Sequence, residues 1–381
     1  MMRFTLPRDM YYGKGALEDL KNLSGKKAIV VSGGSSMRKG GFLDQIEGYL
    51  KEAGMEVRFF EGVEPDPSVE TVMRGAKAMQ EFEPDWIVAI GGGSPIDAAK
   101  AMWAFYEHPD TTFEDLIVPF NFPKLRTKAH FCAIPTTSGT ATEVTAFSVI
   151  TDYSKGIKYP LADFEITPDV AILDPVLVAS LPAKQVAYTG MDALTHAVEA
   201  YIGHSNTKDT SEKAEVATKL IFENLEEAYK NGKDLHAREQ MLLASHYAGI
   251  AFTRAYVGNV HAIAHNLGGF YGVPHGLANA IILPYVLDFY GETAYERLAR
   301  LCECAGVAKA GQTDEQKALD FIQAIRDMNA RMNIPDKIEK IQEKDIETIA
   351  KRACKEANPL YPVPRIMDLD DCIAIIHRLM P

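Results

Sequence analysis

The strongest constraint on the fold is a change of sequence pattern at Ser180-Leu181-Pro182. Before this point, apolar runs typical of buried strands alternate with segments of helical periodicity. The strand runs cover 26–32, 57–61, 85–90 and 129–134, and the helical segments cover 41–53, 68–82 and 96–106. Strands separated by helices favour a parallel, doubly wound sheet with ligands at the carboxyl ends of its strands.

Beyond that point strand signals become rare, and Ala- and Leu-rich helical patterns dominate. The predicted helices cover 183–203, 209–230, 235–256, 259–269, 276–290, 293–305, 314–332, 343–357 and 369–379. A chain of 381 residues is also too long for one ordinary core. We therefore predict two domains, an α/β domain with a mostly parallel sheet over 1–180 and an all-helical domain over 181–381.

Composition narrows the possible partners and the compartment. The net charge of −12 argues against binding to nucleic acid or to an anionic membrane surface. No window approaches the ~18 consecutive apolar residues of a membrane span, and the start MMRFTLPR lacks the apolar core of a signal peptide. The five cysteines have scattered spacing, which favours free thiols in a reducing compartment. We expect a cytoplasmic protein.

Four side chains of the second half have the composition of a metal site. Asp192 and His196 are four residues apart in a predicted helix, so they share one face and can bind one ion. His261 and His275 follow, and His265 lies among the same Gly and Ala neighbours. Three imidazoles and one carboxylate suit zinc, ferrous iron, manganese or nickel.

Two loops of the first half have the composition of a nucleotide site. Residues 91–95, GGGSP, stand between a predicted strand and a predicted helix, where glycines allow close approach of a phosphate to the helix start. The loop over 135–145, PTTSGTATEVT, is rich in hydroxyl groups that could bind a ribose or a pyrophosphate. Neither loop is a GxGxxG fingerprint or a P-loop.

These segments, taken in order, resemble blocks of the iron-containing (group III) alcohol dehydrogenase family. The blocks are GGGSPIDAAK at 91–100, IPTTSGTATEVT at 134–145, TGMDALTHAVEA at 189–200, and HAIAH at 261–265 with HGLAN at 275–279. The resemblance runs nearly end to end and is closest to the bacterial butanol and 1,3-propanediol dehydrogenase branch. It implies the dehydroquinate synthase-like fold, without the aldehyde dehydrogenase half of bifunctional relatives.

The resemblance also implies roles for individual residues. The metal ligands are Asp192, His196, His261 and His275, with Fe²⁺ as the first choice and Zn²⁺ also compatible with the ligand set. His265 matches an active-site histidine beside the nicotinamide, or else a partner of the ligands. The cofactor-binding positions are Gly92, Gly93, Ser94, Asp97, Thr136, Thr137, Thr140 and Lys158.

One departure from the family pattern bears on the choice of nucleotide. Members that prefer NAD tend to carry an acid at the end of the first strand, whereas residues 32–39 here read SGGSSMRK. An acid would repel the 2′-phosphate of NADP, and these residues can accept it. We hypothesise a preference for NADP(H) over NAD(H), with contacts from Gly33, Gly34, Ser35 and Ser36, and with Arg38 or Lys39 as further candidates.

The implied function is a metal-dependent alcohol dehydrogenase or aldehyde reductase that acts as a homodimer. Hydride passes between NADP(H) and a small primary alcohol, a diol or the corresponding aldehyde, with the metal as Lewis acid on the substrate oxygen. Three alternatives stay open, namely a lyase of the dehydroquinate synthase type, a non-catalytic metal- or nucleotide-binding protein, and a purely structural assembly subunit. Four apolar residues either line the substrate pocket or belong to the core, namely Phe147, Phe252, Val257 and Phe270.

Overall fold

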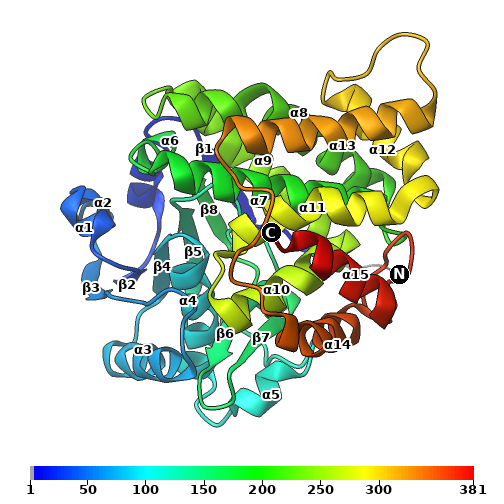
Figure 1. Ribbon diagram of the computed structural model, residues 1–381. Helices are drawn as coiled ribbons and strands as arrows, with labels where there is room; N and C mark the ends of the chain where they lie inside the picture. The colour runs from blue at the N-terminus through cyan, green and yellow to red at the C-terminus, as the bar shows by residue number, and fades with distance from the viewer. Residues whose placement is uncertain (1–3) are drawn as a thin grey trace. The chain divides into compact units, whose positions relative to one another are not determined.

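The computed structural model describes residues 4–381 (Figure 1). Residues 1–3, the start of the segment considered above for a signal peptide, lie outside the described residues. The described chain forms two compact units, one ending at Ser180 and the other beginning at Leu181. Among residues 4–381, no helix combines the length and the apolar character that a membrane crossing requires.

The first unit is built on a six-stranded sheet in which all neighbouring strands are parallel. Its strands, in spatial order, are β1 (Asp9–Tyr12), β8 (Val170–Leu173), β5 (His130–Pro135), β4 (Trp86–Gly91), β2 (Lys27–Ser32) and β3 (Glu56–Phe60). The four predicted strands are confirmed as β2, β3, β4 and β5. Pattern alone missed β1 and β8, because four residues are too few to show a periodicity.

A second, two-stranded sheet in this unit was also missed. It is an antiparallel hairpin of β6 (Phe147–Asp152) and β7 (Ile157–Ala162). The strand β7 contains Pro160, which lacks a backbone N–H and is therefore tolerated only where a strand is unpaired on one side. That proline weakens the strand signal, whereas the edge position of β7 accommodates it.

Apolar residues fill both faces of the main sheet, as expected for a parallel sheet covered by helices. On one face, the helices α3 (Val69–Phe82) and α4 (Gly93–Glu107) pack on alternate strand residues, namely Ile29, Val31, Ile87, Ala89, Phe131 and Ala133. On the other face, η1 (Ala16–Asn22) and α2 (Phe42–Glu52) cover the residues in between, namely Ala28, Val30, Val88, Ile90, Cys132 and Ile134. Short helices complete the unit: α1 (Ser36–Lys39), α5 (Phe113–Ile117), η2 (Phe164–Ile166) and α6 (Pro175–Val178).

The strand order creates a switch point between β2 and β4. From β2 the chain passes outward to β3, and from β4 it passes to β5 on the other side of the sheet. The segments that follow β2 and β4 therefore diverge at their carboxyl ends. In open parallel sheets this is where ligands bind.

The second unit is helical in all its regular elements among residues 181–381. Its α-helices are α7 (Ala183–Ile202), α8 (Lys208–Lys230), α9 (Leu235–Ala255), α10 (Asn259–Tyr271), α11 (His275–Tyr290), α12 (Tyr295–Cys304), α13 (Asp314–Arg331), α14 (Ile346–Ala357) and α15 (Leu369–Leu379). Two single turns, η3 (Gly291–Thr293) and η4 (Glu343–Asp345), precede α12 and α14. All nine predicted helices are confirmed within a few residues at each end.

Capping residues and packing explain where these helices begin and how they are held. Capping boxes start α8 at Thr207, α13 at Thr313 and α15 at Asp368. The helices α7, α8 and α9 pack against one another, and α11 packs on both α7 and α10 (Figure 1). This packing brings together the helices that carry the predicted metal ligands.

Candidate active site

Three helices of the second unit carry the predicted metal ligands. Asp192 and His196 lie one turn apart on α7, whose opening follows Pro182. His261 and His265 lie one turn apart on α10, and His275 is the first residue of α11, directly after Pro274. The helical spacing inferred from the sequence therefore holds at both pairs, since each pair shares one helix face.

Three of the four predicted ligands form a close cluster. One ligand atom from each of Asp192, His261 and His275 lies within 4.8 Å of the others. Asp192 Oδ1 is 3.4 Å from His275 Nε2 and 3.9 Å from His261 Nε2. Asp192 and His261 are buried, whereas His275 is partly exposed. One oxygen and two imidazole nitrogens at this spacing suit a borderline divalent ion.

The fourth predicted ligand, His196, lies beside this cluster. Its ring stacks on that of His261, with centroids 4.6 Å apart and planes 21° apart. On another side it stacks on Phe252 at 4.1 Å. His196 therefore adjoins His261 but is not one of the three residues whose ligand atoms converge.

Sequence reasoning missed Glu199, which orients His261. Glu199 Oε2 lies 2.5 Å from His261 Nδ1, and Oε1 accepts the backbone N–H of Val260 at 2.8 Å. The carboxylate thus meets the start of α10, where backbone N–H groups are free. A side chain at Gly258 would come within 2.7 Å of Oε1, so the carboxylate needs a glycine there. The signal was present in the sequence, because Glu199 stands seven residues, two helical turns, after Asp192.

The Glu199 contact fixes which nitrogen of His261 faces the cluster. A carboxylate at Nδ1 favours the tautomer that carries its proton there, which leaves the Nε2 lone pair for a metal. Burial, together with the neighbouring His196, His275 and His265, holds the pKa of His261 well below its ordinary value, so the ring is neutral. Burial raises the pKa of Glu199 to about 7 against the opposing effect of the backbone N–H groups that it accepts.

His265 has a carboxylate partner that the sequence did not indicate. Its Nδ1 lies 2.7 Å from Oε1 of Glu356 on α14, and the Tyr361 hydroxyl donates to the same oxygen at 2.9 Å. The His265 ring stacks on that of His275, with centroids 5.2 Å apart and planes 14° apart. Glu356 therefore holds the Nδ1 side of the His265 ring, and Nε2 lies on the side of the ring away from Glu356.

In the first unit, the two predicted nucleotide loops lie side by side. Gly91 and Pro135 end the paired strands β4 and β5, and Thr136 N–H donates to Gly91 O at 2.8 Å. Gly91 has a φ of 148°, and a side chain there would clash with Pro95, so only glycine fits. The helix α4 begins at Gly93, three residues earlier than predicted, which puts Ser94 in its first turn.

The loops fit tightly, because a Cβ at Gly92 or Gly93 would press on Thr137 or Thr140. Of the other predicted contacts, Asp97 is occupied within the unit, where its carboxylate accepts from Thr142 Oγ1 at 2.6 Å and Val149 N at 2.9 Å. Asp97 therefore holds the two loops together, and each of its carboxylate oxygens already accepts a hydrogen bond from the protein.

The segment after β2 forms the other side of the switch point. Gly33, Gly34 and Ser35 follow the strand, and Ser36 begins α1. Arg38 is held between two carboxylates, 2.6 Å from Asp44 and 2.7 Å from Glu61, whereas Lys39 is exposed. Lys158 on β7 pairs with Asp66 at 2.7 Å.

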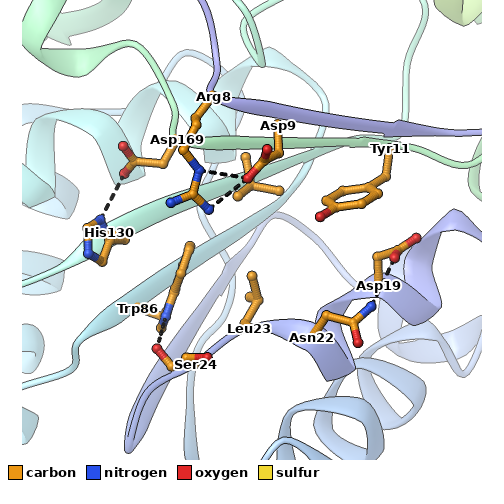
Figure 2. Close-up of a pocket in the computed structure, with 11 residues that line it drawn as sticks. Arg8, Asp9, Tyr11, Asp19, Asn22, Leu23, Ser24, Trp86, His130 and Asp169 are labelled. Carbon is orange, nitrogen blue, oxygen red and sulfur yellow. Dashed lines mark hydrogen bonds and ion pairs between the residues drawn. The ribbon is translucent and has the colours of Figure 1, made fainter.

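A pocket at the amino ends of the strands, away from the two glycine-containing loops, holds none of the predicted site residues. Figure 2 shows this pocket, whose lining includes Arg8, Asp9, Tyr11, Trp86, His130 and Asp169. Asp9, Trp86 and His130 begin β1, β4 and β5, so the pocket lies at their amino ends. Ligands of parallel sheets bind at the carboxyl ends, which makes this pocket a poor nucleotide site.

The four apolar residues that the sequence suggested for a substrate pocket have different surroundings. Phe252 lies against His196, as described above, and Phe270 lies under the guanidinium of Arg352, 4.9 Å from its ring centroid. Phe147 begins β6 in the first unit, and Val257 lies between α9 and α10. Phe252 is therefore tied to the metal cluster by its contact with His196, one of the predicted ligands.

A parallel α/β unit with glycine loops at its switch point, followed by a helical unit with an Asp/His cluster, is the architecture of dehydroquinate synthase-like dehydrogenases. Residues 7–175 match the family model described as "Iron-containing alcohol dehydrogenase". Residues 186–380 match "Fe-containing alcohol dehydrogenase family, C-terminal". The chain belongs to the iron-containing alcohol dehydrogenase family.

Individual relatives agree with this family. Over 369 residues, 94% of each chain, the protein is 54% identical to NADPH-dependent butanol dehydrogenase of Clostridium saccharobutylicum. A solved structure, 1,3-propanediol oxidoreductase, is 35% identical with a TM-score of 0.94 over the whole of both chains. The bifunctional aldehyde-alcohol dehydrogenase of Escherichia coli (strain K12) is 37% identical, and the match spans 95% of this chain but 45% of that enzyme. These matches do not favour the lyase or the non-catalytic alternative.

Proposed function

We propose that the protein reduces small aldehydes with NADPH, or oxidises the corresponding primary alcohols or diols, at a divalent metal held by the second unit. The observation that carries this proposal is the convergence of Asp192, His261 and His275, with Glu199 behind His261. The unit ending at Ser180 would bind the dinucleotide, and the unit from Leu181 would supply the catalytic groups.

The residues of the cluster fit a metal ion in their chemistry. Asp192 contributes an anionic oxygen, and His261 contributes a neutral nitrogen whose lone pair faces the cluster. His275 completes the convergent set, and we assign His196, whose ring stacks on that of His261, as the fourth ligand. A divalent ion there, Fe²⁺ in our assignment, supplies Lewis-acid chemistry to a substrate hydroxyl or carbonyl.

We assign His265 Nε2 as the atom that exchanges a proton with the substrate oxygen. Glu356 holds Nδ1 at 2.7 Å, so the ring presents Nε2 in a fixed orientation. A positioned imidazole is suited to this role near neutral pH. The aromatic stack with His275 further restricts rotation of the ring.

The dinucleotide would lie at the switch point of the sheet. Gly92, Gly93 and Ser94 offer backbone N–H groups at the start of α4, where a pyrophosphate is favourable. Thr136, Thr137 and Thr140 lie beside them and can donate to a ribose or a phosphate, as can Lys158 after release from Asp66. Asp97 would act indirectly, by holding the threonine loop. Bound NADP(H) supplies the hydride donor or acceptor.

We propose a preference for NADPH because residues 33–36 contain no carboxylate. Arg38 is adjacent, but its guanidinium pairs with Asp44 and Glu61, so it would have to leave both carboxylates to contact a 2′-phosphate. The name of the butanol dehydrogenase relative supports the same preference. The five free thiols support a reducing, cytoplasmic location, and we further propose a homodimer, which light scattering would test.

Purified protein reconstituted anaerobically with Fe²⁺ or Zn²⁺ provides the test, with short-chain aldehydes and either NADPH or NADH. We expect turnover that needs the metal, with a higher kcat/KM for NADPH. Asp192→Ala should lose nearly all metal and turnover while staying folded, because it removes the only anionic ligand. Full turnover in metal-free protein would refute the metal proposal, and equal or better use of NADH would refute the nucleotide preference.

A further inference from the structure

One buried amide touches all three residues of the metal cluster. Asn279 lies on α11 one turn after His275 and is fully buried. Its Nδ2 is 2.7 Å from Asp192 Oδ1, 3.2 Å from His261 Nε2 and 3.1 Å from His275 Nε2. These are the same three atoms whose mutual distances define the Asp192–His261–His275 cluster.

The chemistry of the three atoms explains why an amide nitrogen faces them. An ionised carboxylate can only accept hydrogen bonds, and His261 Nε2 is an acceptor when its Nδ1 proton faces Glu199. His275 Nε2 is also an acceptor in the tautomer that binds a metal, and three acceptors this close repel one another in a buried site unless a donor or a cation lies among them. The amide of Asn279 has two hydrogens, which is enough to serve Asp192 and one imidazole at a time.

The other end of the amide argues for the same orientation. Asn279 Oδ1 is buried and has no hydrogen-bond partner among residues 4–381. Turning the amide over would give Nδ2 that position and would put Oδ1 against the Asp192 carboxylate, where two acceptors oppose each other. The side chain therefore leaves its own oxygen unsatisfied in order to donate to the ligand atoms.

We propose that Asn279 is a positioning residue that preassembles the metal site. It draws Asp192, His261 and His275 together before the ion arrives. The ion then replaces it at the imidazole lone pairs, while Asp192 Oδ1, which has more than one lone pair, can keep the Asn279 bond. This inference rests on the proposed function, since it requires that the Asp192–His261–His275 cluster binds a divalent metal.

Metal affinity tests the inference directly, with Co²⁺ and Zn²⁺ titrated into metal-free protein against a competing chelator. We expect Asn279→Ala to bind both ions 10- to 100-fold more weakly than the wild type, the usual effect of losing a group that orients metal ligands. Asn279→Ser keeps a shorter donor and is the milder change, so we expect an intermediate affinity. The Co²⁺ absorption spectrum of each variant at saturation should still report nitrogen and oxygen ligands.

A matched control separates this role from a general effect on packing. Like Asn279, Asn329 is buried and has an Oδ1 without a hydrogen-bond partner among the described residues. Its Nδ2 donates to the Ala280 carbonyl of α11 and not to the metal cluster. Asn329→Ala should lower thermal stability but leave metal affinity unchanged. Wild-type affinity in both Asn279 variants would overturn the inference alone, whereas a wild type that binds neither ion would overturn the metal site of the proposed function.

Discussion

At the scale of single residues, the predicted metal site includes a carboxylate that is not among the predicted ligands. Glu199 reaches the Nδ1 of His261 from a position on α7 that is 62 residues away in sequence. A carboxylate at this nitrogen both selects the tautomer and makes the imidazole a better ligand. This buried acid thus orients one histidine, and it also accepts a hydrogen bond from the free N–H of Val260 at the start of α10.

Replacing Glu199 by Gln should weaken metal binding about 10- to 100-fold. The amide preserves the shape of the side chain but removes the negative charge that holds the Nδ1 proton. Isothermal titration of metal-free protein with Zn²⁺ measures the effect, and Glu215→Gln, which removes a carboxylate paired with Arg300 outside the site, is the control. Unchanged affinity in Glu199→Gln would show that the contact does not orient the ligand.

At the scale of secondary-structure elements, the start of α11 is fixed by its contact with the backbone of α7. A Cβ at Gly276 would lie 2.3 Å from the carbonyl oxygen of Tyr188, so the two helices approach through a glycine. Gly276 directly follows His275, and Tyr188 precedes Asp192 by one turn. The distance between these two predicted ligands is therefore set by helix packing.

Gly276→Ala should destabilise the protein by about 1–3 kcal/mol, as overpacking does, and should also weaken metal binding because α11 must shift. Gly269→Ala on α10 is the matched control, since a Cβ there meets nothing within 4 Å and alanine favours a helix. Chemical denaturation and metal titration measure the two effects. A Gly276→Ala protein that matches the control in both would contradict this account.

The opening of α3 gives an element-scale prediction about pH. Burial raises the pKa of Glu64, but hydrogen bonds from Ser68, backbone N–H groups and Thr71 outweigh it and lower the pKa to about 2. The folded pKa is below the ordinary value of 4.5, so this stability is present above about pH 4.5 and is lost as pH falls toward 2. Glu64→Gln should therefore lose less unfolding free energy than the wild type over that range. Urea titrations of both proteins at several pH values would measure the unfolding free energy. The same dependence of this free energy on pH in the two proteins would contradict the prediction.

At the scale of the whole molecule, metal binding should stabilise one unit more than the other. All predicted ligands belong to the unit that begins at Leu181. An ion at 100 times its Kd adds roughly 2.7 kcal/mol to the stability of the state that binds it.

Removing the metal should therefore lower the Tm and should increase amide hydrogen exchange in α7, α10 and α11. Exchange in β2, β4 and β5 should stay the same, because those strands carry no predicted ligand. Mass spectrometry of exchange in chelated and metal-loaded protein measures both units in one sample. Equal changes across both units would argue against a metal site confined to the helical unit.

The sequence by itself determined the alternation of strands and helices, the helical second half, and the faces shared by Asp192 with His196 and by His261 with His265. These features follow from local periodicity, which a chain carries in its spacing. Tertiary structure alone decided that Glu199 meets His261, that Glu356 meets His265 and that Asn279 meets Asp192, across separations of 62, 91 and 87 residues. Such contacts depend on how helices pack, and no spacing along the chain records the distance between side chains on different helices.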